Sequence, residues 1–292
     1  MSKPTPRLPP EILDFVVDLL YPEKVTLRKC CLLSKSWVPR ARKHLFAYIR
    51  FEHPADLEAW KTTFPDPASS PAYHTHSLFV GCVQAISAAD AEEGGWIQTF
   101  SNVLRLEVRS GIRNIHEQTN PLVLLHNFSP RLKSLLVVSR NLSPSQVFSL
   151  SCSMPLLEDL GIVSHGMSSS YDGGTVFRPS TSPVLTGILG LYVPEGMEYT
   201  ARQLLNMPNG LRFWKFNCTL CLEEDLQWII ALVTTCSDTL KCIEIDNYVP
   251  RTFFLILRVV KYLTNSHLHQ GVHSQLQSTS QERQSSKKWC SD

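Results

Sequence analysis

The sequence predicts an α/β protein, in which a small N-terminal bundle of three helices is followed by an α/β solenoid with a curved parallel sheet. Two observations carry this prediction. Residues 1–50 hold three short helical patterns, and a strand-like apolar pattern then recurs at nearly constant intervals through residues 51–263. Residues 264–292 are rich in Ser and Gln and nearly free of apolar residues, which predicts a disordered tail.

The first helical pattern is LPPEILDFVVDLLY. Pro9 and Pro10 suit a first helical turn, where a missing N–H leaves no hydrogen bond unmade. The helix has two apolar faces, one of Leu13, Val16, Val17 and Leu20 and the other of Ile12, Phe15 and Leu19. A terminal helix that is apolar on both faces indicates a partner for the second face.

Two more helices complete the predicted bundle. Thr26 is the expected N-cap of the second, which runs to about Ser34 with Leu27, Cys30, Cys31 and Leu33 directed inward. Ser36 is the expected cap of the third, in which Trp37, Ala41, His44 or Leu45, and Tyr48 recur at helical spacing. Three helices in about forty residues support only a small core.

The pieces LPPEIL, TLRKCCLLSKSW and RARKHLF follow one another as in an F-box, and residues 8–46 resemble that domain in the form common in fungal proteins. Ser34 stands where the family usually has Cys. The resemblance implies docking to a Skp-family adaptor and, through it, to a cullin–RING ubiquitin ligase. The residues that it implies for adaptor binding are Leu8, Pro9, Ile12, Leu13, Leu32 and Trp37.

The repeated pattern has the form L-x-x-L-x-L, with other apolar residues allowed, and it follows an expected first strand at Tyr48–Phe51. Six copies begin at Val103, Leu132, Leu157, Leu185, Leu211 and Leu240, at intervals of 29, 25, 28, 26 and 29 residues. A weaker copy begins at Thr75. This spacing is typical of leucine-rich repeats, in which each copy gives one strand to a parallel sheet. The copies are irregular, because the fourth slips by one residue and none has Asn at the usual position.

Helical patterns at 54–64, 143–150, 197–207 and 222–236 separate the strands, and a further helix is expected after Pro250. Residues 168–183 have no period and predict a long loop. Strands that alternate with helices also fit a doubly wound sheet, but the near-constant period favours the solenoid.

The face of the predicted sheet that carries the third, fifth and seventh residues of each copy is the candidate substrate surface. Because strand side chains alternate, those residues lie opposite the core. The candidates for substrate binding are Arg105, Arg109, Leu136, Val138, Tyr192, Phe213, Lys215 and Glu244. Charges at both ends flank an apolar middle, which is common in protein-binding patches.

The charge distribution and the cysteine content indicate possible partners and a cellular compartment. Residues 1–50 carry ten Lys and Arg against four Asp and Glu, so a nucleic-acid-binding or scaffold protein that uses this basic bundle is the alternative hypothesis. No secretion signal or membrane-length apolar segment is found, and nine cysteines then indicate free thiols in the cytoplasm or nucleus.

The sequence offers little chemistry of its own. It has no phosphate-binding glycine loop and no serine elbow, and no nucleophile is paired with a base. Cys218 and Cys221, with Cys236 and Cys242 downstream, invite a zinc site, but the second pair has the wrong spacing. His267, His269 and His273 suggest at most incidental metal binding. We therefore expect neither an enzyme nor a cofactor, and no membrane association.

Overall fold

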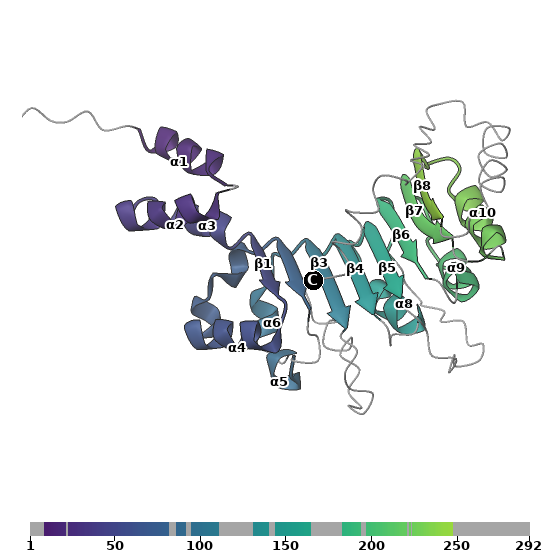
Figure 1. Cartoon of the computed structure of the whole chain (residues 1–292), viewed down its shortest axis with the longest axis horizontal. Helices are drawn as coiled ribbons and strands as arrows, with labels where there is room; N and C mark the ends of the chain where they lie inside the picture. Colours follow the sequence, from purple (N-terminus) through teal and green to yellow (C-terminus); the bar gives the residue numbers. More distant parts are fainter. Residues whose placement is uncertain are drawn as a thin grey trace, which may run out of the picture.

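The structure is a computed structural model that describes residues 9–21, 23–81, 86–91, 95–110, 131–139, 144–164, 183–193, 197–220, 222 and 224–247. Within these ranges the chain is a mixed α/β protein built on an open, all-parallel, eight-stranded sheet. Figure 1 shows the strands side by side in chain order, with three helices before the first strand.

The three N-terminal helices, hereafter the helical unit, are α1 (Pro10–Leu19), α2 (Lys24–Leu33) and α3 (Val38–Leu45). All three were expected, but two of their starts were misplaced. The second begins at Lys24, so Thr26 lies inside it and is not its N-cap. The residue that precedes the third is Trp37 rather than Ser36. In each case the predicted cap was a residue type that favours that position but does not require it.

The strands follow the sequence pattern closely. They are β1 (Tyr48–Phe51), β2 (Ser77–Val80), β3 (Arg105–Ser110), β4 (Ser134–Ser139), β5 (Asp159–Ser164), β6 (Ile188–Tyr192), β7 (Lys215–Leu220) and β8 (Cys242–Asn247). The strand order in a doubly wound sheet reverses at one point, whereas these strands follow chain order throughout. The doubly wound alternative is therefore wrong. The weaker copy that begins at Thr75 supplies β2.

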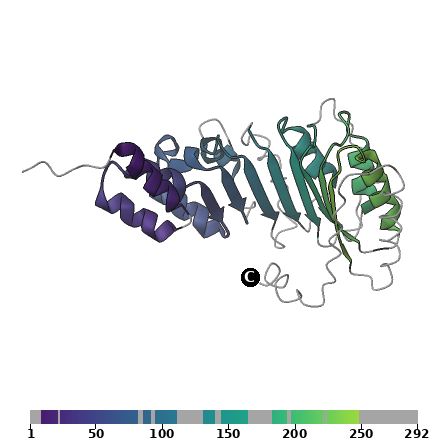
Figure 2. The same ribbon diagram turned by 90° about the horizontal axis from the view of Figure 1, so that it is seen from above.

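The described helices of the sheet region pack against one face of the sheet (Figure 2). They are α4 (Pro54–Thr63), α5 (Ala88–Ala91), α6 (Trp96–Thr99), α8 (Pro144–Cys152), α9 (Met197–Leu205) and α10 (Asp225–Thr235), with the short 3₁₀ helices η1 (Pro67–Ser69) and η2 (Pro71–His74). Parallel strands need such crossovers. The opposite side of the sheet, hereafter the open face, carries the alternate side chains of each strand.

One continuous core lies between the sheet and these helices. Aliphatic side chains from neighbouring strands stand in register, as in the row Leu106, Leu135, Leu160 and Leu189, all at most 2% exposed. The helices contribute residues such as Phe148 and Val233 to the same cluster. Described helices bury apolar side chains on the strands beside them, and the described core extends from β1 to β7.

A ladder of backbone hydrogen bonds runs across the sheet just before the strands begin. The carbonyl of Leu104 accepts the N–H groups of Lys133 and Ser134, both at 2.9 Å, and the carbonyls of Ala47, His76, Lys133, Gly187 and Trp214 each accept two N–H groups in the same way. This ladder links consecutive strands at the edge where they start. It shows how neighbouring copies stay aligned here without a conserved asparagine.

The fourth copy of the repeat, which begins at Leu185, has one extra residue, and the Asp159 side chain accommodates it. Where the pattern requires a second N–H bond to the Glu158 carbonyl, the Ile188 N–H instead donates to Asp159 Oδ1 at 2.7 Å. A β-carbon at Gly187 would collide with that carboxylate. Asp159 and Gly187 therefore absorb the extra residue together, and β6 regains its register with β5.

The fifth copy of the repeat begins at Phe213, two residues later than the start at Leu211 that the sequence predicted. Phe213, expected on the substrate surface, is fully buried, whereas Trp214, expected in the core, is 43% exposed. The pairing of Phe216 with Ile243 makes Phe213, Phe216 and Cys218 the inward residues of this copy. A shift of two keeps the faces of a strand, so Lys215 still lies on the open face.

Several expectations fall outside the described residues and are not addressed by the structure. They concern Leu8, most of the predicted loop at 168–183, Cys221, the helix expected after Pro250, and the tail at 264–292 with its three histidines. Among the helices that the structure does describe, none has the length and apolar character needed to cross a membrane.

Candidate interaction surfaces

The helical unit has a core of its own, separate from that of the sheet. Val17, Leu27 and Ala41, one from each helix, are completely buried. Leu20, Cys31, Trp37 and Leu45 pack around them and are only partly covered. Three fully buried side chains are few for three helices, so much of the unit's apolar surface remains accessible.

That surface lies on α1 and α2. Ile12, Phe15, Val16 and Leu19 are 40–65% exposed, and their spacing places them along one side of α1. On α2, Val25, Leu32 and Leu33 are exposed, with Leu32 at 88%. We call these seven residues the apolar surface of the helical unit. Exposed apolar residues that line one side of a helix, as the four on α1 do, mark interaction sites more often than isolated ones do.

The residues expected to bind an adaptor divide into two groups. Pro9, Ile12 and Leu32 are exposed, whereas Leu13 and Trp37 are partly buried, with Trp37 packed against the small core. Leu33, expected inside, is 74% exposed. The second apolar face predicted for α1 contains Phe15 and Leu19, so their exposure could be expected from the sequence. Nothing in the sequence predicted the exposure of Val25.

An ion cluster ties α1 to α3. The Arg40 guanidinium donates two hydrogen bonds to the Asp18 carboxylate, one of them 2.7 Å long at Oδ1, and His44 Nε2 lies 2.6 Å from the same oxygen. These contacts, those of Arg40 first, hold the pKa of Asp18 well below its ordinary value of 3.8. Arg40 is therefore committed to an internal contact, which weakens the case for a basic nucleic-acid surface.

The open face of the sheet is the second candidate surface. Arg105 and Glu244 are exposed there, and Arg109, Leu136, Val138, Tyr192 and Lys215 are partly exposed, in agreement with their expected placement. Of the eight residues predicted for substrate binding, only Phe213 lies in the core. Lys215 Nζ is 2.7 Å from Glu244 Oε1 on the next strand, so this pair is neutralised within the sheet.

The open face near β1 carries the aromatic side chain of Phe79 among polar residues. Phe79 on β2 is only 3% exposed, because Arg50 and Arg109 from the flanking strands lie over its ring, with guanidinium carbons 4.4 and 5.1 Å from its centroid. Arg50 also pairs with Glu52, and Arg109 Nη2 lies 3.1 Å from Glu107 Oε1. Two of the three arginines on this face are thus already engaged.

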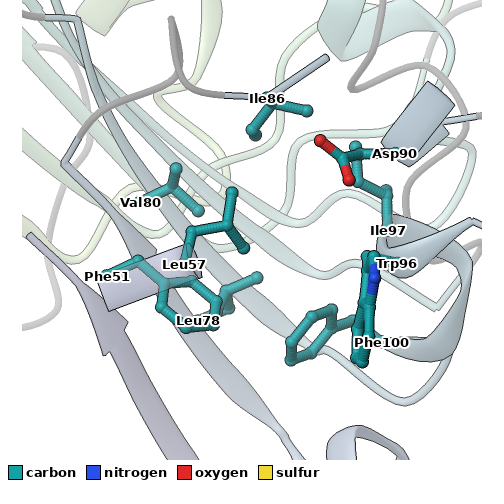
Figure 3. A pocket seen from close by; sticks show the side chains of 9 residues that line it. All are labelled: Phe51, Leu57, Leu78, Val80, Ile86, Asp90, Trp96, Ile97 and Phe100. Carbon is teal, nitrogen blue, oxygen red and sulfur yellow. The ribbon is translucent and has the colours of Figure 1, made fainter. Parts of the chain in front are cut away.

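A small apolar cavity lies on the helical side of the sheet, between β1, β2, α4, α5 and α6 (Figure 3). Its walls include Phe51, Leu57 and Phe100. Asp90 is the charged residue of the lining, and Lys61 Nζ, 2.8 Å from Asp90 Oδ1, neutralises it. Because the Asp90 carboxylate is already paired with Lys61, we assign no ligand to the cavity.

The described cysteines show no sign of metal or nucleophilic chemistry. No cluster of three or more potential metal ligands occurs among the residues that the structure describes. Burial raises the pKa of the Cys152 thiol to about 11 and that of Cys236 to about 12. Thiols with such pKa values stay protonated and behave as small apolar side chains.

Comparison with models of known protein families gives no match for this chain, and comparison with curated proteins gives no significant relative. Inferences about function therefore depend on the residues and surfaces described above.

Proposed function

We propose that this protein is the substrate-recognition subunit of a cullin–RING ubiquitin ligase. In this proposal the helical unit is an F-box-like domain that docks a Skp-family adaptor, and the sheet region is an irregular leucine-rich-repeat-like solenoid that binds a protein substrate. The observation that carries it is the coexistence on one chain of an apolar surface on a small helical unit and a separate, open sheet face.

The helical unit suits the docking role for a physical reason. The apolar surface of α1 and α2 is larger than the unit's own core can bury, and a helical partner would cover it. The residues that resemble the F-box pattern and are also exposed, Pro9, Ile12 and Leu32, belong to or adjoin this surface. We therefore assign adaptor contact to the exposed residues and a structural role to Leu13 and Trp37.

The sheet region suits the capture of a second protein. Its strands recur every 25–29 residues in unbroken chain order, and its open face presents mixed charges around apolar side chains. The chain itself would catalyse nothing. It would raise the effective concentration of the substrate beside the ligase, in the cytoplasm or the nucleus.

The direct test is co-purification with a co-expressed Skp-family adaptor. The double variant Ile12→Asp with Leu32→Asp places two charges on the apolar surface, where neither side chain is needed for folding. We expect at least about a tenfold loss of recovered adaptor, as for central interface residues. The matched control is Leu156→Asp, because Leu156 is 52% exposed outside the helical unit.

Undiminished recovery of the adaptor with the double variant, or no recovery with the wild type, would refute the proposal. The nucleic-acid alternative predicts instead that the purified chain retains RNA or DNA, with binding that falls steeply as salt rises. Arg42 and Lys43, both exposed on α3, are the residues to change to Ala in that case.

A further inference from the structure

Two glycines lie side by side in the middle of the open face. Gly161 on β5 is paired in register with Gly190 on β6. A β-carbon built at Gly190 would have only the Gly161 Cα within 4 Å, at 3.7 Å, apart from its neighbours in the chain. The open face therefore has no side chain of its own at these two adjacent positions.

Neighbouring side chains make this bare area into a notch. The Leu136 side chain leans over Gly161, because its Cδ1 lies 2.6 Å from where a Gly161 β-carbon would stand. Ile188 and Tyr192, two residues before and after Gly190 on the same strand face, are both partly exposed. The notch, defined by Leu136, Ile188, Gly190 and Tyr192, thus has a backbone floor with these side chains around it, and the polar Asn217 pairs with Gly190 on the β7 side.

Among the described residues of the open face, a cation for which no ion pair is seen lies toward β1, at Arg105. Arg105 is exposed on β3, between Ser77 and Ser134 of the flanking strands, and no ion pair joins it to another described residue. Arg50 and Arg109 are held by Glu52 and Glu107. Arg105 is therefore the guanidinium on this face that can bind an acidic group without breaking an existing ion pair.

We propose that the open face binds an extended protein segment that seats a bulky apolar or aromatic side chain in the notch over Gly190 and directs an acidic side chain to Arg105. The β3 residue level with Gly190 is Glu107, three strand spacings or about 14 Å away, and Arg105 lies two residues before it, so Arg105 is about 16 Å from Gly190. Because an extended chain rises about 3.3 Å per residue, the acidic residue lies about four to six positions from the bulky one. This inference rests on the proposed function and specifies the substrate class.

The charges of the face favour a protein segment over a polyanion. Asp159, Glu107 and Glu244 share the face with the arginines, so a chain of phosphates would meet repulsion along most of its length. An acidic side chain at one point, followed by an apolar one, matches both Arg105 and the notch.

The experiment is selection of a phage-displayed library of random 12-residue peptides on the immobilised full chain. We expect enrichment of peptides with Asp or Glu about four to six positions from Trp, Phe, Leu or Tyr. Binding of one enriched peptide, fluorescently labelled, is then measured by anisotropy. Replacing its bulky residue with Ala, or its acidic residue with Lys, is expected to weaken binding at least about tenfold.

Variants of the protein locate the site. Gly190→Leu fills the notch and is expected to reduce affinity at least about tenfold, while Gly190→Ala, whose methyl group meets no described atom closer than 3.7 Å, is the milder control. Arg105→Glu is expected to restore binding to the peptide with Lys in place of the acid. Because Arg105 is exposed, this charge exchange tests the proposal even if Gly190→Leu does not fold.

No enriched peptides, enriched peptides without this spacing, or binding that survives both Gly190→Leu and Arg105→Glu would overturn the inference. Failure of the proposed function is distinguished by a separate measurement. Each folded variant is tested for co-purification with the adaptor, which we expect to be unchanged, since Gly190 and Arg105 lie outside the helical unit. A variant that loses peptide binding but still recovers the adaptor shows a defect of the open face alone.

Discussion

The helical unit and the sheet region use similar apolar residues in different ways. In the sheet region, the apolar positions of the strands face the helices and form one continuous core. Among the described residues of the helical unit, Val17, Leu27 and Ala41 are completely buried and Cys30 is 4% exposed, while more apolar side chains than these stay exposed. The sheet region therefore buries its apolar strand positions in its own core, whereas the helical unit leaves apolar surface for another molecule to cover.

The two regions also differ in how they are held together. The sheet has a backbone ladder between consecutive strands, whereas α1 is tied to α3 by the Asp18, Arg40 and His44 cluster. The described cores of the two regions form separate clusters, and the regions meet where α3 is followed by β1, as in the hydrogen bond of 2.9 Å from Thr75 Oγ1 to the Phe46 carbonyl. Each region is therefore expected to respond to damage separately.

The largest effect is expected in the sheet core, from two adjacent residues. Phe213→Asp should unfold the sheet region, because loss of a buried Phe alone costs about 3–5 kcal/mol and a buried carboxylate adds to this. Trp214→Asp, at a position that is 43% exposed, should leave the fold intact. Chemical denaturation followed by circular dichroism gives the comparison. Equal effects of the two changes would contradict the register described for β7.

The next effect concerns the core of the helical unit. Leu27→Ala should cost about 2–5 kcal/mol locally, because Leu27 is completely buried in a core of three residues. Hydrogen exchange should then accelerate in α1, α2 and α3 while the strands keep their protection. The control is Ile12→Ala, which at an exposed site should change stability by about 0.5 kcal/mol or less. Faster exchange across the sheet as well would show that the two regions unfold together.

A smaller effect is expected from the ion cluster. The lowered pKa of Asp18 means that its contacts stabilise the folded unit above about pH 4, and that this stabilisation is lost as the pH falls toward the folded-state pKa. Asp18→Asn should therefore reduce protection of α1 at pH 7, and the difference from wild type should shrink below pH 4. A difference that grows on acidification would refute the assignment.

The smallest effect is expected for ion pairs on the sheet surface. Lys133 Nζ and Glu158 Oε1 are 2.7 Å apart, but both side chains are about half exposed. Lys133→Gln should change the free energy of unfolding by at most about 1 kcal/mol, since water screens such a pair. Urea denaturation measures the change. A larger loss would mean that surface charges, rather than core and ladder, align the strands.

Much of the architecture could be predicted because its signals are local and periodic. The spacing of Leu106, Leu135 and Leu160 predicts strands with one buried face, and the structure pairs these residues in register. Helices α4, α8, α9 and α10 also lie where helical patterns were expected, and apolar stripes were the signal for α9 and α10. On the open face, alternation along each strand placed Arg105, Leu136 and Lys215 as the structure does.

The remainder depends on tertiary contacts that no local pattern reveals. Leu211, Phe213 and Phe216 are all buried, so the fifth copy could be read in two frames, and only pairing with β8 decides between them. The notch requires that Gly161 and Gly190, 29 residues apart, become neighbours. On α2, the exposure of Leu33 depends on how three helices meet, and not on its residue type.

Binding of the adaptor by the helical unit is tested by hydrogen exchange of the full chain, measured alone and with a purified Skp-family adaptor. We expect slower exchange in α1 and α2 when the adaptor is present, with exchange in β2 to β7 unchanged. The Ile12→Asp, Leu32→Asp double variant should show no such slowing at the same adaptor concentration. Protection that appears on the open face instead, or no change anywhere in the wild type, would contradict the assignment of the helical unit as the adaptor-binding region.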